Sequence, residues 1–157
     1  MKLRIALVLF SFLIFSQNKK DELIYDIIST VSQERLKSDI QKLVDFGTRH
    51  TLSDTISNTR GIGAARRWIK NSFDLISEDC NNCLDVFFQK NYYEKNNLRL
   101  IKNVWINNVV AIQKGLKYPN RFIIMSGDID SRVSDPNNYL SDSPGANDNA
   151  SGMAGTI

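Results

Sequence analysis

The sequence predicts an α/β fold, a three-layer domain in which helices flank a mixed, mostly parallel sheet. Apolar residues repeat with helical spacing over the first half of the chain, whereas β-branched and aromatic residues gather in the second half. Residues 121–126 (RFIIMS) form a nearly continuous apolar run, which is typical of a strand covered on both faces. Helices followed by strands that alternate with loops indicate a layered domain.

The length of the chain and its first residues suggest the domain boundaries. Its 157 residues, 42% of them hydrophobic, provide for one domain with a modest core. Residues 1–16 combine a basic start, an uncharged apolar run and a small final residue, the pattern of a secretory signal peptide. A short membrane anchor is the alternative, although the run covers only about half of a hydrocarbon core roughly 30 Å thick. We therefore expect a secreted or periplasmic domain over residues 17–157 without a stable membrane span.

The charge balance argues against a nucleic-acid partner. The chain carries 20 Lys and Arg against 17 Asp and Glu, a net charge of +3, and two of these basic residues, Lys2 and Arg4, would leave with the signal peptide. The sequence pattern contains no concentrated basic face. We therefore expect no nucleic acid among the partners of this protein.

Three segments of the first half have helical periodicity. Apolar side chains recur three and four positions apart over residues 21–31 and again between Ser32, a candidate N-cap, and Gly47, a glycine that would end the helix. A third helix is predicted over residues 59–77. Its predicted buried face consists of Ile62, Ala65, Ile69, Phe73 and Ile76, and the basic residues Arg60, Arg66, Arg67 and Lys70 are expected mostly outside that face.

The second half has the composition of strands. Residues 84–88 and 100–113 are strand candidates, with a kink or bulge expected at Asn107–Asn108. Cys80 and Cys83 lie in the polar turn before the first of these strands, where export favours a local structural disulfide over a redox pair. Residues 150–157 resemble the first two turns of an apolar helix, so we expect the domain to be incomplete at its C-terminus.

Two acidic clusters are candidates for chemistry. Asp128 and Asp130 follow the apolar run, and sites in open α/β sheets form where loops leave such strand ends. Asp148 lies in a loop (SPGANDNASG, residues 143–152) whose Pro and Gly residues restrict the backbone before the final helix. Each cluster alone is typical of turn residues with an N-cap at Asp148 or Asn149. Together they could converge on a cation.

Several of these segments resemble the zinc-dependent family-28 metallopeptidases, which are secreted aminopeptidases and their glutaminyl-cyclase-like relatives. The resemblance lies in NVVAIQKG, RFIIMSGDIDSR and SPGANDNASGMAGTI, and upstream in FGTRHT and GIGAARRWI. It covers roughly residues 36–157. The stretch PGANDNASG is its most specific part.

The resemblance implies a role for each of the three carboxylates. Asp148 matches the carboxylate that bridges two zinc ions, and the peptide bond after it is typically cis in the family. Asp130 matches the catalytic-site Asp that orients a metal-binding imidazole. Asp128 stands where the family has that His, so an oxygen ligand replaces nitrogen and one zinc position is in question.

The implied reaction is hydrolysis of a peptide substrate by metal-activated water. Paired metal ions would lower the pKa of a bridging water and polarise the scissile carbonyl. The general base and further ligands belong to a downstream Glu-Glu pair, Asp and His of the family, which residues 1–157 do not contain. We therefore expect this chain to be the N-terminal portion of an aminopeptidase and to be inactive by itself.

Other polar residues receive a plainer interpretation. His50, the one histidine of the chain, lies away from the ligand positions that the resemblance implies, so a structural or surface role is favoured. Arg49 and Arg132 could contact carboxylates near the site, and ordinary ion pairing is the default expectation.

Two non-enzymatic interpretations remain open from the sequence. The first is a non-catalytic ectodomain that keeps the fold for partner binding, with a metal site eroded at Asp128. The second is a small secreted module stabilised by calcium. Its oxygen ligands would be Asp128, Asp130, Asp135, Asp142 and Asp148. The calcium module leaves the ordered PGAND match unexplained.

Overall fold

The computed structural model describes residues 22–96 and 100–157, and the chain divides into two compact units, residues 1–33 and 34–157. The described part of the first unit contains helix α2 (Glu22–Ser29). This helix was predicted from its apolar spacing, and its apolar side chains are exposed. The predicted signal peptide, residues 1–16, lies outside the described residues. Within the described ranges, no helix is both long and apolar enough to cross a bilayer.

The described part of the second unit contains nearly all of helix α3, helices α4 and α5, and a β-hairpin. Helix α3 (Gln33–Asp45) ends just before Gly47, as predicted, and α4 (Gly61–Asp79) begins two residues later than expected. Strands β1 (Leu84–Tyr93) and β2 (Val104–Gln113) follow. The chain then runs through η1 (Ala146–Ala150), a turn with non-helical backbone at Asp148 and Asn149, into the short helix α5 (Ser151–Ala154).

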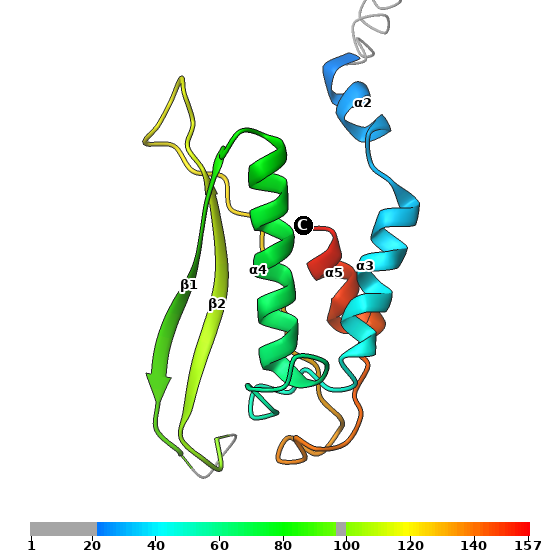
Figure 1. The fold of residues 1–157 in the computed structure, drawn as a ribbon, viewed down its shortest axis with the longest axis vertical. Coiled ribbons are helices and arrows are strands. Elements are labelled where there is room, and N and C mark those ends of the chain that lie inside the picture. The colour runs from blue at the N-terminus through cyan, green and yellow to red at the C-terminus, as the bar shows by residue number, and fades with distance from the viewer. Residues whose placement is uncertain (1–21, 97–99) are drawn as a thin grey trace, which may run out of the picture. The chain divides into compact units, whose positions relative to one another are not determined.

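The core lies where α4 meets α3 and α5. Figure 1 shows α4 between the hairpin and the pair α3 and α5. The apolar faces that the helical spacing predicts account for this arrangement, because each helix directs one stripe toward the shared core. The buried core consists of Leu43, Phe46, Ala64, Ala65, Ile69, Ala150 and Met153.

The predicted three-layer domain with a mostly parallel sheet is wrong for the described residues. Their sheet has two strands, β1 and β2, which pair antiparallel from Leu84 opposite Gln113 to Tyr93 opposite Val104. The connection between the strands is short, and a parallel pair needs a crossover of about a dozen residues or more. Mixed helix and strand is the part of the prediction that holds.

The predicted bulge at Asn107–Asn108 is also wrong. Asn107 pairs with Lys90 and Asn108 with Gln89, without an extra residue on either strand. The Asn108 side-chain amide donates to Gln89 Oε1 at 2.8 Å. The two asparagines therefore continue the ladder and add a cross-strand side-chain bond.

Residues 121–126 differ most from their prediction. They belong to no strand, and the side chains of Ile123 and Ile124 are 96% and 87% exposed. No strand in the described residues pairs with them. The apolar run is therefore exposed and outside the sheet.

Helix α4 carries one basic residue whose predicted position is wrong. Arg66 is 5% exposed and Nη1 donates to the Trp105 carbonyl of β2 at 3.5 Å. The aliphatic part of an arginine can be buried while its charged end finds a polar atom. Arg66 therefore belongs to the face of α4 that meets the hairpin.

Cys80 and Cys83 form the predicted local disulfide, with 5.5 Å between their Cα atoms. The two residues between them, Asn81 and Asn82, have φ angles of 62° and 60°. Asparagine is among the residues that adopt this left-handed region most readily. The bridge closes the turn from α4 into β1.

Candidate functional site

The two acidic segments are brought together by a buried seam of hydroxyl groups. The Arg49 amide donates to Ser131 Oγ at 3.0 Å, and Ser131 Oγ in turn donates to the Ser143 carbonyl at 2.5 Å. The Ser143 amide donates to the Gly47 carbonyl at 2.8 Å. Ser131 and Ser143 are 4% and 6% exposed. Satisfied polar groups in so buried a position define one arrangement of the segments that carry them.

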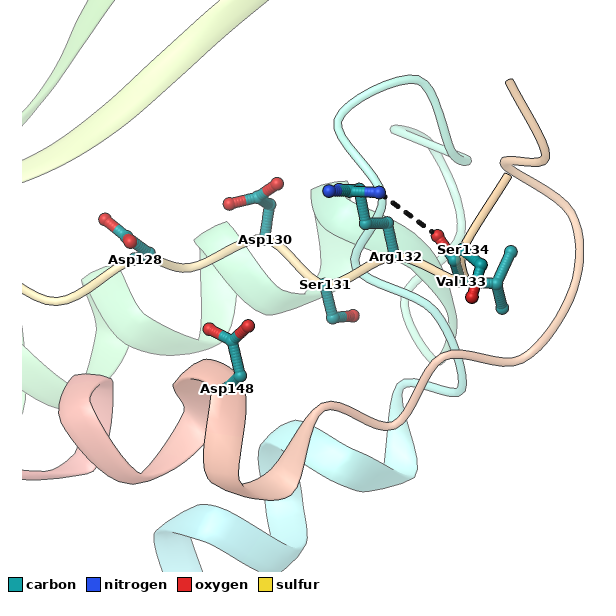
Figure 2. A pocket seen from close by; sticks show the side chains of 7 residues that line it. All are labelled: Asp128, Asp130, Ser131, Arg132, Val133, Ser134 and Asp148. Carbon is teal, nitrogen blue, oxygen red and sulfur yellow. Dashed lines mark hydrogen bonds between the residues drawn. The ribbon is translucent and has the colours of Figure 1, made fainter. Parts of the chain in front are cut away.

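A cavity of about 570 Å³ opens beside this seam. Asp128, Asp130 and Asp148 line it together with residues 131–134. Figure 2 shows the Asp148 carboxylate directed toward the segment that carries Asp128 and Asp130. All three carboxylates are exposed, so water or an ion can reach them. The structure therefore brings the three predicted site residues to one cavity.

Glycine permits the close approach of the two segments. Gly145 has a φ angle of 50°, and a Cβ atom there would lie 2.6 Å from Cβ of Ser131. At Gly127, a Cβ atom would lie 2.8 Å from the Met153 backbone. A larger residue at either position would push the acidic segments apart.

The loop around Asp148 has the geometry that the family resemblance implies. The peptide bond from Asp148 to Asn149 is cis. Asn149 Oδ1 accepts a hydrogen bond from the Gly152 amide at 3.0 Å. The N-cap residue of α5 is Ala150, without a side-chain cap bond, so the predicted N-cap at Asp148 or Asn149 is not confirmed. The Asp148 carboxylate lines the cavity instead.

The carboxylates fit part of a metal-ligand set. Asp128 and Asp148 offer oxygen atoms, which bind Zn²⁺ at about 2.0–2.2 Å in proteins. Within residues 22–96 and 100–157, however, no three His, Cys, Asp or Glu side chains are grouped closely enough to hold an ion. The described residues therefore supply at most two ligands to one zinc ion, and not a complete set.

The remaining acidic candidates have other partners. Asp142 pairs with Arg60, with 2.6 Å between Oδ1 and Nη2. Asp135 Oδ1 accepts the Asn137 amide at 2.9 Å and so closes a turn. The calcium module that would gather five carboxylates is therefore not formed by the described residues.

His50 has a structural role, as predicted. The ring is 5% exposed, Nδ1 accepts the Leu52 amide at 3.0 Å, and Nε2 lies 3.0 Å from the Pro136 carbonyl. These partners assign the proton to Nε2, because a carbonyl can only accept. With both ring nitrogens engaged, His50 links its own loop to the loop after the cavity.

Arg49 is the site residue whose contacts the sequence did not indicate. Ordinary ion pairing was the expectation, yet Arg49 is 1% exposed and its guanidinium donates to backbone carbonyls of both acidic segments. Burial lowers the pKa of Arg49 from its ordinary value, and the nearby Asp130 charge opposes that shift. The FGTRHT motif, which contains Arg49 and is one part of the resemblance outside the two acidic loops, is the signal that could have pointed to it. Arg132, by contrast, is exposed and bonds to the carbonyl of Val133.

Comparison with curated proteins finds relatives named probable zinc metalloproteases. The chain is 45% identical over 134 residues to one from Pyrenophora teres f. teres. This match covers 85% of this chain and 28% of that protein. A second relative, from Leptosphaeria maculans, is 43% identical, and the match covers 85% of this chain and 31% of that protein. The relative from Pyricularia oryzae is 44% identical over 81% of this chain and 25% of that protein.

The chain thus spans between a quarter and a third of the length of these curated relatives. No protein-family profile matches the chain. No solved structure matches it either. The relatives' names support a zinc metallopeptidase in general and specify neither family 28 nor an aminopeptidase.

Proposed function

We propose that this chain supplies part of the metal centre of a secreted zinc metallopeptidase of the family-28 type, acting as an aminopeptidase. The observation that carries the proposal is the shared cavity of Asp128 and Asp148, two residues 20 positions apart in the sequence. Similarity to probable zinc metalloproteases over 85% of the chain supports the same assignment. The secreted location rests on the signal-peptide pattern of residues 1–16.

The carboxylates take distinct roles in this proposal. Asp148 is the residue that would bridge two zinc ions, and Asp128 would bind one of them through oxygen in place of the family's imidazole nitrogen. Zinc, when bound, would polarise a carbonyl and lower the pKa of a coordinated water, which makes that water a better nucleophile. Asp130 lines the same cavity, and because Asp128 offers no N–H for it to accept, Asp130 would repel Asp128 instead of orienting it, while its negative charge strengthens the attraction of the cavity for a cation.

Peptide cleavage also needs a general base. None of the three cavity carboxylates is assigned that role, because Asp128 and Asp148 would bind metal and Asp130 matches a family residue that is not the base. We therefore expect residues 1–157 by themselves to leave an aminoacyl-nitroanilide uncleaved. Turnover of that substrate by the purified chain, at a rate sensitive to Asp148→Asn, would contradict this part of the proposal.

Zinc binding tests the metal centre directly. Isothermal titration of the purified chain with Zn²⁺ should give saturable binding that Asp148→Asn abolishes or weakens by at least about 10-fold, since a charged ligand is lost. Asp135→Asn removes the same charge from the same part of the chain without touching the cavity, so it should bind as the wild type does. Equal affinity in the wild type and Asp148→Asn would overturn the metal site.

Aminopeptidase specificity needs a second assay. In the longest product that the gene encodes, aminoacyl-nitroanilides with a free amino end should be cleaved, and acetylated counterparts should not. Cleavage of both, or of internal bonds only, would leave a zinc peptidase and remove the exopeptidase assignment.

A non-catalytic ectodomain is the second candidate function. The observation that favours it is Asp128, an oxygen ligand where the family has nitrogen, together with the incomplete ligand set of the described residues. This candidate predicts that the chain and the longest gene product both fail to bind Zn²⁺ while remaining folded. The titration described above therefore separates the two candidates.

A further inference from the structure

We propose that Arg49 is the positioning residue of this site: its buried guanidinium holds both carboxylate-bearing segments in one arrangement. Its significance for metal binding depends on the proposed function, whereas its effect on the two segments is measurable without metal. Arg49 does not line the cavity, so it acts through the residues that do.

The guanidinium makes four hydrogen bonds to backbone carbonyls. Nε donates to Ile129 O at 2.9 Å, and Nη2 donates to Gly145 O at 3.0 Å. Nη1 donates to Leu43 O at 2.8 Å and to Pro144 O at 2.7 Å. One side chain thus ties the end of helix α3 to both acidic segments.

The acceptors on the acidic segments are close to the cavity carboxylates. Ile129 lies between Asp128 and Asp130, so a fixed Ile129 carbonyl restricts the backbone that directs both side chains. The Gly145 carbonyl also accepts the Ala150 amide at 3.0 Å, closing the turn that contains Asp148. Arg49 therefore makes one hydrogen bond to the stretch that carries Asp128 and Asp130, and two to the loop that carries Asp148.

An arginine is suited to this position and a lysine is not. The guanidinium is a flat fork with five N–H donors, whereas an ammonium is a point charge at the end of a flexible chain. The four carbonyls come from three separate segments of the chain and converge on the planar guanidinium of Arg49. Lysine would keep the charge and lose the simultaneous contact with both acidic segments.

The charge of Arg49 complements its geometry. Asp128, Asp130 and Asp148 line one cavity and carry charge of the same sign. Burial lowers the pKa of Arg49, and the attraction of the nearby Asp130 charge opposes that shift. The cationic guanidinium near Asp130 therefore offsets part of the negative charge around the cavity.

Hydrogen–deuterium exchange of the metal-free full chain tests the positioning role. Arg49→Lys keeps the charge, and we expect its amides in residues 128–132 and 145–150 to exchange at least about 10-fold faster than in the wild type. The α4 amides around Ile69 should keep their protection. Sucrose in all samples favours the folded state, so that a loss of global stability does not hide the local effect.

Two control variants separate positioning from general destabilisation. Val104→Ala weakens a buried contact on β2, outside the core cluster that contains Ala150, and it should leave the exchange of both segments near the wild-type rate. Ser131→Ala removes the hydroxyl seam but keeps Arg49, so residues 145–150 should stay protected. If Ser131→Ala frees both segments as fully as Arg49→Lys, or if Arg49→Lys frees neither, the proposal is overturned.

Zinc titration of the same variants supplies the functional readout. Arg49→Lys should bind Zn²⁺ about 10–100-fold more weakly than the wild type, the usual cost of losing a partner behind the ligands. Wild-type affinity in Arg49→Lys, with both segments still protected, contradicts the inference. If the wild type itself binds no Zn²⁺, the proposed metal site is wrong, and the exchange rates alone decide whether Arg49 positions the segments.

Discussion

Residues 121–126 and residues 127–132 are consecutive in the chain, yet they differ in exposure and in hydrogen bonding. The first stretch is apolar and exposed, with Ile123 at 96% exposure and no strand among the described residues beside it. The second is acidic, yet Ser131 within it is 4% exposed and bonded on several sides. In this part of the molecule, hydrogen bonds from a distant arginine determine the position of the backbone more than apolar composition does.

The largest effect should come from removing that arginine. Arg49→Met deletes four hydrogen bonds from a charged donor, one of them to the carbonyl of the buried residue Leu43 and three to partly buried carbonyls. Because bonds to charged groups are worth about 1.5–3 kcal/mol each and are not additive, we expect a loss of about 3–5 kcal/mol in the free energy of unfolding. Urea unfolding followed by circular dichroism measures it, and a loss below about 1 kcal/mol would remove the contrast between the two stretches.

Removing one hydroxyl of the seam should have a smaller effect. Ser131→Ala leaves the Arg49 amide and the Ser143 carbonyl without this partner in a buried position. Unsatisfied buried polar groups cost about 1–3 kcal/mol, so the unfolding free energy should fall by that amount. The same urea titration measures the loss, with Ser134→Ala at the exposed cavity edge as the control that should change little.

An exposed polar contact should contribute less, and its contribution should depend on pH. Hydrogen bonds from the Ser57 and Ile56 amides hold the pKa of Asp54 below its ordinary value. Such a carboxylate stabilises the fold above its unfolded pKa of about 3.9 and loses that contribution as pH falls through its lower folded value.

The difference in urea midpoint between the wild type and Asp54→Ala should therefore be present at neutral pH. It should shrink as the pH falls through the folded pKa of Asp54. A difference that grows on acidification would show that another group is responsible. A difference that is absent at neutral pH would show that these exposed hydrogen bonds add nothing to stability.

The smallest effect belongs to the apolar stretch itself. Ile123→Ser replaces a side chain that contacts mostly solvent, so the unfolding free energy should change by no more than about 0.5 kcal/mol. A loss above about 2 kcal/mol, measured in the same way, would mean that residues 121–126 are covered in solution. The comparison of the two stretches would then have to be abandoned.

The sequence predicts well those elements whose signal is local. Helical spacing and the glycine at position 47 locate α3 and α4, and the Cys80–Cys83 spacing predicts the bridge, because neighbouring residues decide each of these features. The strand at residues 121–126 fails because a strand needs a partner, and composition alone does not supply one. Arg66 fails for a similar reason, since its burial depends on the hairpin that packs on α4.

In the candidate site, too, features with a local sequence signal were predicted, and features that depend on the fold were not. Asp128, Asp130 and Asp148 could be selected from motif and resemblance, and the structure places all three around one cavity. The contacts of Arg49 could not be predicted, because its hydrogen-bond partners are carbonyl groups, which every residue carries. Only the path of the backbone in three dimensions brings those carbonyls to one guanidinium.

A double-mutant cycle on zinc binding tests the shared cation most directly. The titration is carried out on the wild type, Asp128→Asn, Asp148→Asn and the double variant. If the two carboxylates hold one ion, either single change removes most of the binding and the second change adds little, so the effects are strongly non-additive. Independent, additive effects, or a Zn²⁺ affinity that neither substitution changes, would contradict the account.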